Sequence, residues 1–586
     1  MKQFFKFLSA SCLGTLLALG LIVLLFIGIG SMSAGKQKVE KNSVLKLDIN
    51  HLVPEKTDNV PEEGPFNFEE TVSIGIHRIV DLIEHAKTDP AIKGIVLNGE
   101  QSGIGLTHMF AIEEALRDFK ESDKFIYSYG NYYTQPGYFM SSVADSIFMW
   151  PEGGVDIRGL SASVMFVKDF LDKIGVEMEI FYAGDFKSAT EPYRRNSMTD
   201  QNRLQLREFL NSINKNFVGQ IDENRGFENG YTQRAMANFE HSSAEGAIST
   251  GFVDALLFPS DFDDLIRDTL GIEKEKGKIN YISLYDYHDR AEIENKIDIK
   301  NQIAVVIAEG DVIYNSEEKG VISEEKYIKI IDRIIKNDKI KAVVLRVNSG
   351  GGSALTSDIL WKKVEELKAS GKPVIASFGN YAASGGYYIA AGADTILAEP
   401  NTLTGSIGVF TMLPKVKKLF EDKLGIQVDT VKTAPMAVSM SPFFYSSQRE
   451  KELMEKGTDD FYDRFLSIVA EGRGMSKEAV HEVAQGRIWS GEDGVKNGLV
   501  DLLGDLDDAI DIAAKSADLE SYSLKYYPYI KENPYRKLIS ELMKDQAMVN
   551  QPKLNRHEEE LLNKYNELKR FVSYEGPMMR LPFIFQ

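Results

Sequence analysis

The sequence has very little cysteine, histidine or tryptophan: its 586 residues include one cysteine, eight histidines and three tryptophans. With Cys12 as the only cysteine, no disulfide can form within the chain, and cysteine–histidine metal sites and cysteine nucleophiles are disfavoured. Cys12 precedes the main apolar run and follows Ser9, Ala10 and Ser11. The apolar residue expected three positions before a lipidated cysteine is missing, so we reject lipidation.

Positive charge is also scarce, since 68 Lys and Arg face 87 Asp and Glu, giving a net charge of −19. A surface that binds nucleic acid needs clustered Lys and Arg, so nucleic acid is not expected as a partner. We interpret the excess of acidic residues as a solvated acidic surface. At 43% hydrophobic residues the chain can bury a core, and its length indicates more than one domain.

The one long apolar run lies at the N-terminus. Lys2 and Lys6 precede an uncharged stretch, residues 7–35, whose centre from Leu13 to Ile29 is almost wholly apolar. That length crosses about 30 Å of hydrocarbon. The preceding lysines predict a cytoplasmic N-terminus, a single-pass anchor in the inner (plasma) membrane, and all later residues outside the cytoplasm. The rival is a cleaved signal peptide, with Ser31 and Ser33 near the cleavage site; its apolar region would be unusually long.

A long internal repeat divides the rest of the chain. The offset between matching segments stays between 247 and 250 residues, which chance does not explain well. The matches are 93–97 with 341–345, 130–132 with 379–381, 144–147 with 393–396, 172–175 with 422–425, and 251–254 with 498–501. We therefore predict an anchor region (1–43), two duplicated domains (44–299 and 300–524), and a C-terminal extension (525–586) whose role the sequence does not reveal.

Each half alternates β-rich runs with helical patterns, which predicts an α/β fold with parallel strands. In the second half, residues 303–307, 342–347, 374–378 and 395–398 are expected strands, and 325–336 and 357–369 expected helices. The polar segment 285–300 is expected to connect the halves. In the extension, residues 555–570 have a charged helical pattern and 581–585 are mostly apolar.

Two glycine-rich turns follow expected strands of the second half, at 348–353 (NSGGGS) and 382–387 (AASGGY). Such a turn suits a nucleophilic serine, because nearby backbone N–H groups can bind an oxyanion. The first turn lacks the ending of a phosphate-binding loop. Alone, each turn is better explained as a plain tight turn. The repeat aligns Ser384 with Gln135, so the first half lacks this serine.

A nucleophilic serine needs a base. His481 is the main histidine candidate in the second half, although a surface role suits it better, and a Ser–His–Asp triad remains open. Lysine is the other option, provided that burial lowers its pKa from about 10.4.

Three motifs resemble those of signal peptide peptidase A in its long, duplicated form. Residues 379–388 (GNYAASGGYY) resemble its nucleophile motif, 184–193 (GDFKSATEPY) its base-bearing segment, and 404–409 (TGSIGV) a third segment. The anchor, the repeat and the order of motifs also fit, so the resemblance covers nearly the whole chain before the extension.

The resemblance implies a crotonase-like (ClpP-like) fold and a Ser–Lys protease. Ser384 would be the nucleophile, Lys187 the general base and Ser406 the residue that orients the lysine. The N–H groups of Gly385 and Gly351 would form the oxyanion hole. The sequence departs from the family pattern at Gly350, where proline is usual, and at Asn380, where Asp is common. The repeat aligns Lys187 with Ala437 or its neighbours, so each half would hold one of the two catalytic groups.

The resemblance further implies a membrane-bound endopeptidase that degrades cleaved signal peptides and other apolar peptides, works without metal or organic cofactor, and assembles as a homotetramer. Two alternatives remain open: an acyl-CoA-handling enzyme of the crotonase type, and a non-catalytic membrane scaffold. Sequence alone does not decide whether Lys187 meets Ser384 within one chain or between chains.

Overall fold

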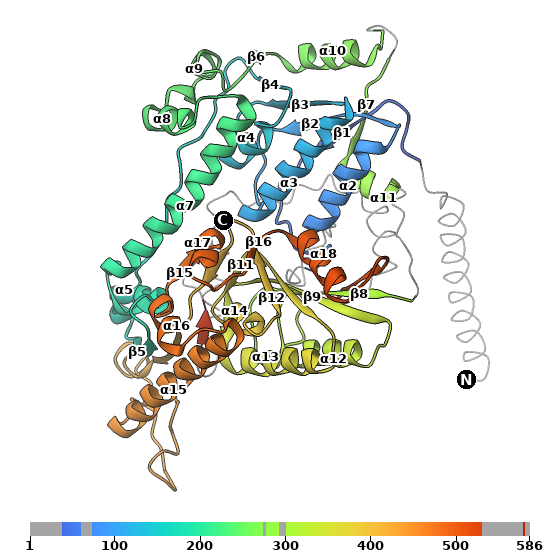
Figure 1. Ribbon diagram of the computed structural model, residues 1–586. Helices are drawn as coiled ribbons and strands as arrows, with labels where there is room; N and C mark the ends of the chain where they lie inside the picture. Colours follow the sequence, from blue (N-terminus) through green and yellow to red (C-terminus); the bar gives the residue numbers. More distant parts are fainter. Residues whose placement is uncertain (1–37, 60–72, 274–276, 292–299, 530–577, 581–586) are drawn as a thin grey trace, which may run out of the picture.

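A computed structural model describes the chain except for residues 1–37, 60–72, 274–276, 292–299, 530–577 and 581–586 (Figure 1). The expected anchor, the helical pattern at 555–570 and the apolar end at 581–585 lie outside the described residues. Within the described ranges, no helix combines the length and apolarity needed to cross a membrane.

The first half is built on a six-stranded parallel sheet in the order β6-β4-β3-β2-β1-β7. Its strands are β1 (Ser43–Leu47), β2 (Ile92–Asn98), β3 (Phe125–Gly130), β4 (Ser146–Met149), β6 (Ala255–Leu256) and β7 (Asn280–Ser283). The helices α2 (Ile76–Thr88), α3 (Leu106–Phe119), α4 (Gln135–Ser141), α8 (Tyr231–Asn238), α9 (Ala244–Ser249), α10 (Pro259–Leu270) and α11 (Leu284–Arg290) surround it. Helix α11 lies in the expected connection.

The second half repeats this sheet in the order β16-β12-β11-β9-β8-β17, again all parallel. The strands are β8 (Gln302–Glu309), β9 (Ile340–Ser349), β11 (Val374–Ala383), β12 (Thr395–Ala398), β16 (Leu502–Leu503) and β17 (Ser523–Tyr527). Two further strands, β13 (Leu403–Gly405) and β15 (Ile488–Ser490), extend the sheet beyond the far end of β11. The four expected strands are confirmed, as are the two helices, α12 (Glu324–Ile335) and α13 (Ala354–Ala369).

Equivalent aspartates accept hydrogen bonds from strand N–H groups in both sheets. Asp145 and Asp394 each accept a hydrogen bond from a strand N–H, at 2.8 Å. Asp254 and Asp501 each accept one at 2.7 Å, from the N–H of the second residue of β4 and of β12 respectively. The predicted α/β duplication is therefore visible in both the strand order and the hydrogen bonds.

Helix α7 (Asp200–Arg225) joins the halves, and its counterpart α15 (Gln448–Arg473) has the same length of 26 residues. In Figure 1, α7 runs from beside the first sheet down to the second half. Near its C-terminus, Phe217 and Ile221 belong to the core of the first half. Nearer its N-terminus, Phe209 packs in a cluster with Ala383 and Leu403 of the second half. Burying both ends of one helix ties the halves together.

A third, smaller sheet takes strands from both halves and from the C-terminal extension. Its order is β10-β18-β14-β5, with β10 (Gly351–Ser353), β18 (Met578–Arg580), β14 (Val409–Lys415) and β5 (Glu177–Ala183). Strands β5 and β14 pair antiparallel over seven residues, from Glu177 opposite Lys415 to Ala183 opposite Val409. The chain leaves β5 directly into the segment that carries Lys187.

The remaining helices support the second half and the junction. They are α5 (Lys168–Ile174), α6 (Glu191–Arg194), α14 (Gly385–Ala390), α16 (Lys477–Val483), α17 (Gly491–Lys496) and α18 (Leu506–Ser516).

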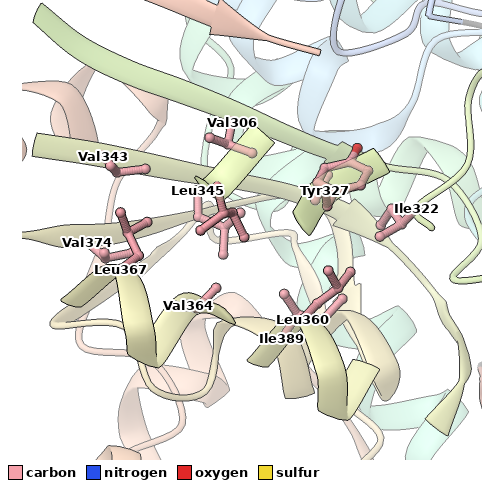
Figure 2. Close-up of a pocket in the computed structure, with 12 residues that line it drawn as sticks. Val306, Ile322, Tyr327, Val343, Leu345, Leu360, Val364, Leu367, Val374 and Ile389 are labelled. Carbon is pink, nitrogen blue, oxygen red and sulfur yellow. The ribbon is translucent and has the colours of Figure 1, made fainter. Parts of the chain in front are cut away.

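A cavity of about 20 Å³ lies in the apolar core between the sheet of the second half and helices α12 and α13, where Val306, Leu345 and Leu360 line it (Figure 2). Its lining is aliphatic apart from Tyr327, so this cavity is a packing gap without a group for chemistry.

Candidate active site

Ser384 occupies the turn between strand β11 and helix α14. Its backbone angles are φ 55° and ψ −118°, a conformation that side-chain-bearing residues rarely adopt. Its N–H donates to the carbonyl oxygen of Gly405 at 2.8 Å, and its carbonyl oxygen accepts from the N–H of Tyr388 at 2.9 Å. The strained strand-to-helix turn is therefore held from both sides, as expected where a serine side chain must be aimed.

Close backbone packing explains the glycines after Ser384. A Cβ atom on Gly386 would lie 2.6 Å from the carbonyl oxygen of Ser349, and one on Gly385 would lie 2.6 Å from the hydroxyl of Ser357. A larger residue at 386 would push helix α14 away from the end of β9. The two glycine-rich turns predicted from the sequence thus pack against each other.

Lys187 belongs to the first half, but the second half holds its loop. The N–H of Phe186 donates to the carbonyl oxygen of Gln485 at 2.8 Å. A Cβ atom on Gly486 would lie 2.6 Å from backbone atoms of Lys187, so this position also requires glycine. From helix α7, the side-chain amide of Gln205 donates to the carbonyl oxygen of Phe186 at 3.2 Å.

The structure brings Lys187 and Ser384 of one chain into hydrogen-bond contact, although 197 residues separate them in sequence. The Lys187 Nζ lies 2.8 Å from the Ser384 Oγ, and 3.1 Å from both the hydroxyl and the carbonyl oxygen of Ser406. The Ser384 hydroxyl therefore contacts a lysine, while His481 pairs with the hydroxyl of Tyr462 on a neighbouring helix at 3.0 Å.

Burial sets the protonation state of the lysine. Lys187 is 1% exposed and Ser384 is fully buried. Burial alone lowers the pKa of the Lys187 amine well below its usual value, because the charged form loses its hydration. All three hydrogen-bond partners of Nζ are uncharged oxygens, so they do not offset this loss as a carboxylate would. The amine is thus suited to accept a proton.

Ser406 stands between strands β13 and β14, also with a left-handed backbone (φ 50°). Its N–H donates to the carbonyl oxygen of Arg487 at 2.7 Å. Through its hydroxyl and its carbonyl it meets the same lysine nitrogen, so it fixes where Nζ lies. The sequence motif that suggested Ser406 therefore selects a residue that touches the lysine.

The backbone around Gly351 and Gly385 is crowded. Gly351 has φ +97°, and a Cβ atom built on it would lie 2.6 Å from the backbone nitrogen of Gly385. The N–H of Gly351 donates to the hydroxyl of Ser349 at 3.1 Å. The two expected oxyanion donors are therefore neighbours, and one of them has an internal partner.

A buried ionic cluster behind β9 and β11 is a feature that sequence reasoning missed. Arg346 of β9 donates to Glu55 of the first half at 3.0 Å and to Glu399 at 3.4 Å. Glu55 also pairs with His108 at 2.9 Å and His77 at 3.1 Å. The Arg346 guanidinium and the histidine hydrogen bonds hold the pKa of Glu55 well below its usual value despite its burial.

Asn380 provides a second link between the halves, close to the serine. Its side-chain oxygen accepts from the N–H of Thr107 at 2.8 Å and from the Thr107 hydroxyl at 3.2 Å, at the start of helix α3. A Cβ atom on Gly105 would lie 2.3 Å from the Asn380 amide. The departure noted at Asn380 in the sequence thus has a structural role, which no signal within either half reveals.

Comparison with known proteins decides the family. The model of Peptidase family S49 matches residues 118–269 and 366–520, once in each half. This chain belongs to peptidase family S49. As a member of S49 it is a serine protease, and the double match confirms the duplication.

Several relatives are similar in sequence to this S49 protein over most of its length. "Protease 4" of Haemophilus influenzae is 34% identical over 84% of this chain and 82% of its own length. "Protease 4" of Salmonella typhi is 34% identical over 77% of this chain and 73% of its own. "Serine protease SPPA, chloroplastic" of Arabidopsis thaliana is 29% identical over 82% and 70%. The resemblance to signal peptide peptidase A is confirmed.

Among solved structures, a point mutant of ClpP1 from Listeria monocytogenes is 16% identical, covers 35% of this chain and 94% of its own, and has a TM-score of 0.23. A point mutant of the 1510-N membrane-bound stomatin-specific protease is 15% identical, covers 39% and 99%, and has a TM-score of 0.25. The α/β architecture rests on the strand order described above, and the narrower crotonase (ClpP-like) assignment stays a prediction.

Proposed function

We propose that this S49 protease works through a Ser–Lys dyad, with Ser384 as nucleophile and Lys187 as general base. The observation that carries the proposal is the 2.8 Å contact between Lys187 Nζ and Ser384 Oγ in a buried site. A neutral amine at this distance can take the hydroxyl proton as the oxygen attacks.

The proposed reaction forms and then hydrolyses an acyl-enzyme. Ser384 Oγ attacks the peptide carbonyl carbon while Lys187 takes its proton. Lys187 then gives this proton to the leaving amine as the C–N bond breaks. In the second stage, Lys187 takes a proton from water, whose oxygen attacks the ester carbonyl carbon. The bond from that carbon to Ser384 Oγ then breaks, and Lys187 returns the proton to Oγ as the carboxylic acid product leaves. Ser406 keeps Nζ in place through both stages by its 3.1 Å contacts.

The oxyanion would be bound by backbone N–H groups of Gly385 and Gly351. Support comes from the short approach of the two glycine backbones beside the serine turn. The N–H of Gly351 would have to share its hydrogen with, or leave, the Ser349 hydroxyl when substrate binds. A donor of this kind contributes about 3–4 kcal/mol in other serine proteases.

The proposed substrates are apolar peptides, including signal peptides released in the membrane. Residues 13–29 would anchor the enzyme there, with the two halves outside the cytoplasm in a homotetramer. The length of the apolar run and the two lysines before it support the anchor and its orientation. The substrate class and the homotetramer rest on the resemblance to signal peptide peptidase A.

The proposal can be tested with purified full-length protein in detergent. We expect hydrolysis of an apolar peptide, and covalent labelling of Ser384 by a serine-directed acylating probe. The Ser384→Ala and Lys187→Ala chains should lose both. The Gln135→Ala chain, altered at the equivalent position of the first half, should keep both and serves as the matched control.

The result that would overturn the dyad is full hydrolysis by either the Ser384→Ala or the Lys187→Ala protein. Wild-type protein that neither cleaves peptides nor reacts with the probe would favour the scaffold alternative instead. Adding liposomes that carry a signal peptide should increase cleavage of that peptide relative to a polar peptide of equal length; equal cleavage would argue against the proposed substrate class.

A further inference from the structure

Strand β18, residues Met578–Arg580, lies against the candidate active site although it belongs to the C-terminal extension. It pairs antiparallel with β10, where Gly351, Gly352 and Ser353 face Arg580, Met579 and Met578. On its other side, Met578 pairs antiparallel with Phe410 of β14. Strand β10 contains Gly351, and β14 begins three residues after Ser406. Three residues of the extension therefore fill the space between the two strands that border the dyad.

The carbonyl oxygen of Met579 faces the glycine backbones proposed as oxyanion donors. It lies 2.0 Å from the point where a Cβ atom on Gly351 would stand, and the backbone nitrogen of Gly385 lies 2.6 Å from the same point. The carbonyl oxygen and the Gly385 nitrogen are thus close neighbours. A protease binds the carbonyl of the bond to be cut at this place.

Each side chain of β18 is buried against specific residues of the rest of the chain. Met578 is buried in a small cluster with Ala189 and Phe410. Met579 is fully buried in the main core of the second half. Arg580 pairs with Asp311, its guanidinium 3.3 Å from the carboxylate, and both side chains are almost fully buried. The alternation of these side chains along a three-residue strand resembles recognition of an extended peptide by strand addition.

This arrangement also closes the site. Ser384 and Lys187 are completely or almost completely buried, and a peptide strand added to β10 would need the place that β18 takes.

We propose that β18 is a tethered, substrate-like occupant of the active site, which a peptide must displace before Ser384 can act. It follows that Asp311 selects a basic residue directly after the bond presented to Ser384, because Arg580 holds that position in β18. This inference rests on the proposed function, since it assumes that the groove beside Ser384 binds peptides.

A disulfide lock tests the occupancy. Ser353 and Met578 are paired residues of adjacent antiparallel strands, a separation that suits a disulfide. In a full-length Cys12→Ser background, Ser353→Cys with Met578→Cys should crosslink on mild oxidation. The mismatched pair Ser353→Cys with Arg580→Cys should crosslink much less, since those residues are not opposite each other.

The oxidised lock should hydrolyse peptide at least tenfold more slowly than the same protein after reduction. Absence of the crosslink, or equal hydrolysis in both forms, would overturn the inference. Because crosslinking needs no catalysis, it separates this inference from the proposed function: a crosslinked protein that is inactive even when reduced, like an inactive wild type, would count against the protease site and not against the strand.

Charge reversal gives a second test in the full-length chain without new cysteines. Arg580→Glu places two carboxylates together at Asp311, so it should release β18 and raise kcat/KM for an apolar peptide severalfold. Lys525→Glu on strand β17 makes the same charge change away from the site and should have no such effect. An unchanged kcat/KM in Arg580→Glu would contradict a blocking role.

The Arg580→Glu chain also tests Asp311. With β18 released, a peptide with arginine after the cleaved bond should have a lower KM than the same peptide with glutamate there. Adding Asp311→Asn should shrink this preference, mainly through KM and with little change in kcat. A preference that survives Asp311→Asn would rule out Asp311 as the selecting residue.

Discussion

The two halves have the same sheet and complementary differences. Both order six parallel strands identically, and both fix them with equivalent aspartates. Only the first half has a strand at β5; its repeat counterpart at 427–433 has none. Only the second has β14, while residues 159–165 of the first are without a strand. The first half therefore contributes β5 and the second half contributes β10 and β14 to a joint sheet, and each half contributes one group of the proposed dyad.

The largest expected effect is the loss of kcat on replacing Ser384, compared with replacing its counterpart Gln135 in the first half. Ser384→Ala should lower kcat by at least about 10⁴-fold, as the loss of a nucleophile does elsewhere. Gln135 accepts hydrogen bonds at 3.0 Å from the N–H groups of Arg158 and Gly159, so its role is structural. Gln135→Ala should change kcat less than about threefold, and steady-state peptide hydrolysis measures both. A comparable loss in the two variants would contradict the division of roles.

A second prediction compares two buried lysines, Lys187 and Lys415, each 1% exposed. Lys187→Met should abolish hydrolysis, by roughly 10³-fold or more, because no base remains. It should also raise the free energy of unfolding at neutral pH, because a buried amine no longer has to lose its proton. Lys415 lies 3.4 Å from Glu179, so Lys415→Met should destabilise the protein by about 1–3 kcal/mol, because Glu179 loses its buried cation and keeps Ser446 and the more distant, exposed Lys451.

The pH dependence follows from the lowered pKa of Lys187. At a pH between the folded and the unfolded pKa of Lys187, the amine is protonated in the unfolded chain and neutral in the folded one. Folding therefore costs the free energy of removing this proton, and that cost falls as pH rises toward about 10.4. The stability gained by Lys187→Met should therefore be larger at pH 7 than at pH 10. Wild-type kcat/KM should rise with pH to a plateau reached well below 10. Thermal unfolding and pH–rate profiles measure the two; a gain that grows with pH would contradict the assignment.

A third prediction concerns Arg346, which joins the halves through Glu55. Arg346→Met should lower the free energy of unfolding by about 3–5 kcal/mol, because Glu55 and Glu399 stay buried without their cation. Denaturant unfolding measures this loss. The exposed-surface variant Arg449→Met should change stability by less than about 0.5 kcal/mol, since its ion pair is solvated. A similar small effect for Arg346 would mean that the cluster does not hold the halves.

The smallest expected effect is the pH dependence of Glu309, which joins the same cluster by accepting a hydrogen bond from the Glu55 N–H at 2.7 Å. Burial and the neighbouring Glu55 raise the pKa of Glu309 to about 8. A raised carboxyl pKa contributes stability that is fully present below the unfolded value near about 4.3 and is lost as pH rises through about 8. Thermal stability should therefore decline between pH 5 and 8 more in wild type than in Glu309→Gln. If thermal stability changed equally with pH in the two proteins, Glu309 would not be the group responsible for the decline.

The sequence predicted most of the fold and the two residues in contact at the candidate site. Strands rich in β-branched residues and a near-constant repeat offset are strong signals, and the motifs around Ser384 and Lys187 are local. The links between the halves were not predictable in this way. Arg346 and Glu55 lie 291 residues apart, and Asn380 and Thr107 lie 273 apart, with no motif around either pair. Strand β18 was missed because three residues give no periodicity and have no counterpart in the repeat.

The most direct test of the central claim is complementation between two inactive chains. The account places Lys187 and Ser384 of the same chain 2.8 Å apart, so no chain of a mixture of Ser384→Ala and Lys187→Ala has both groups. The two variants would be co-expressed with different affinity tags, and any assemblies that contain both would be isolated by successive purification. We predict that they hydrolyse peptide no faster than either variant alone. Recovery of a substantial fraction of wild-type activity would contradict the account, because it would mean that the lysine of one chain serves the serine of another.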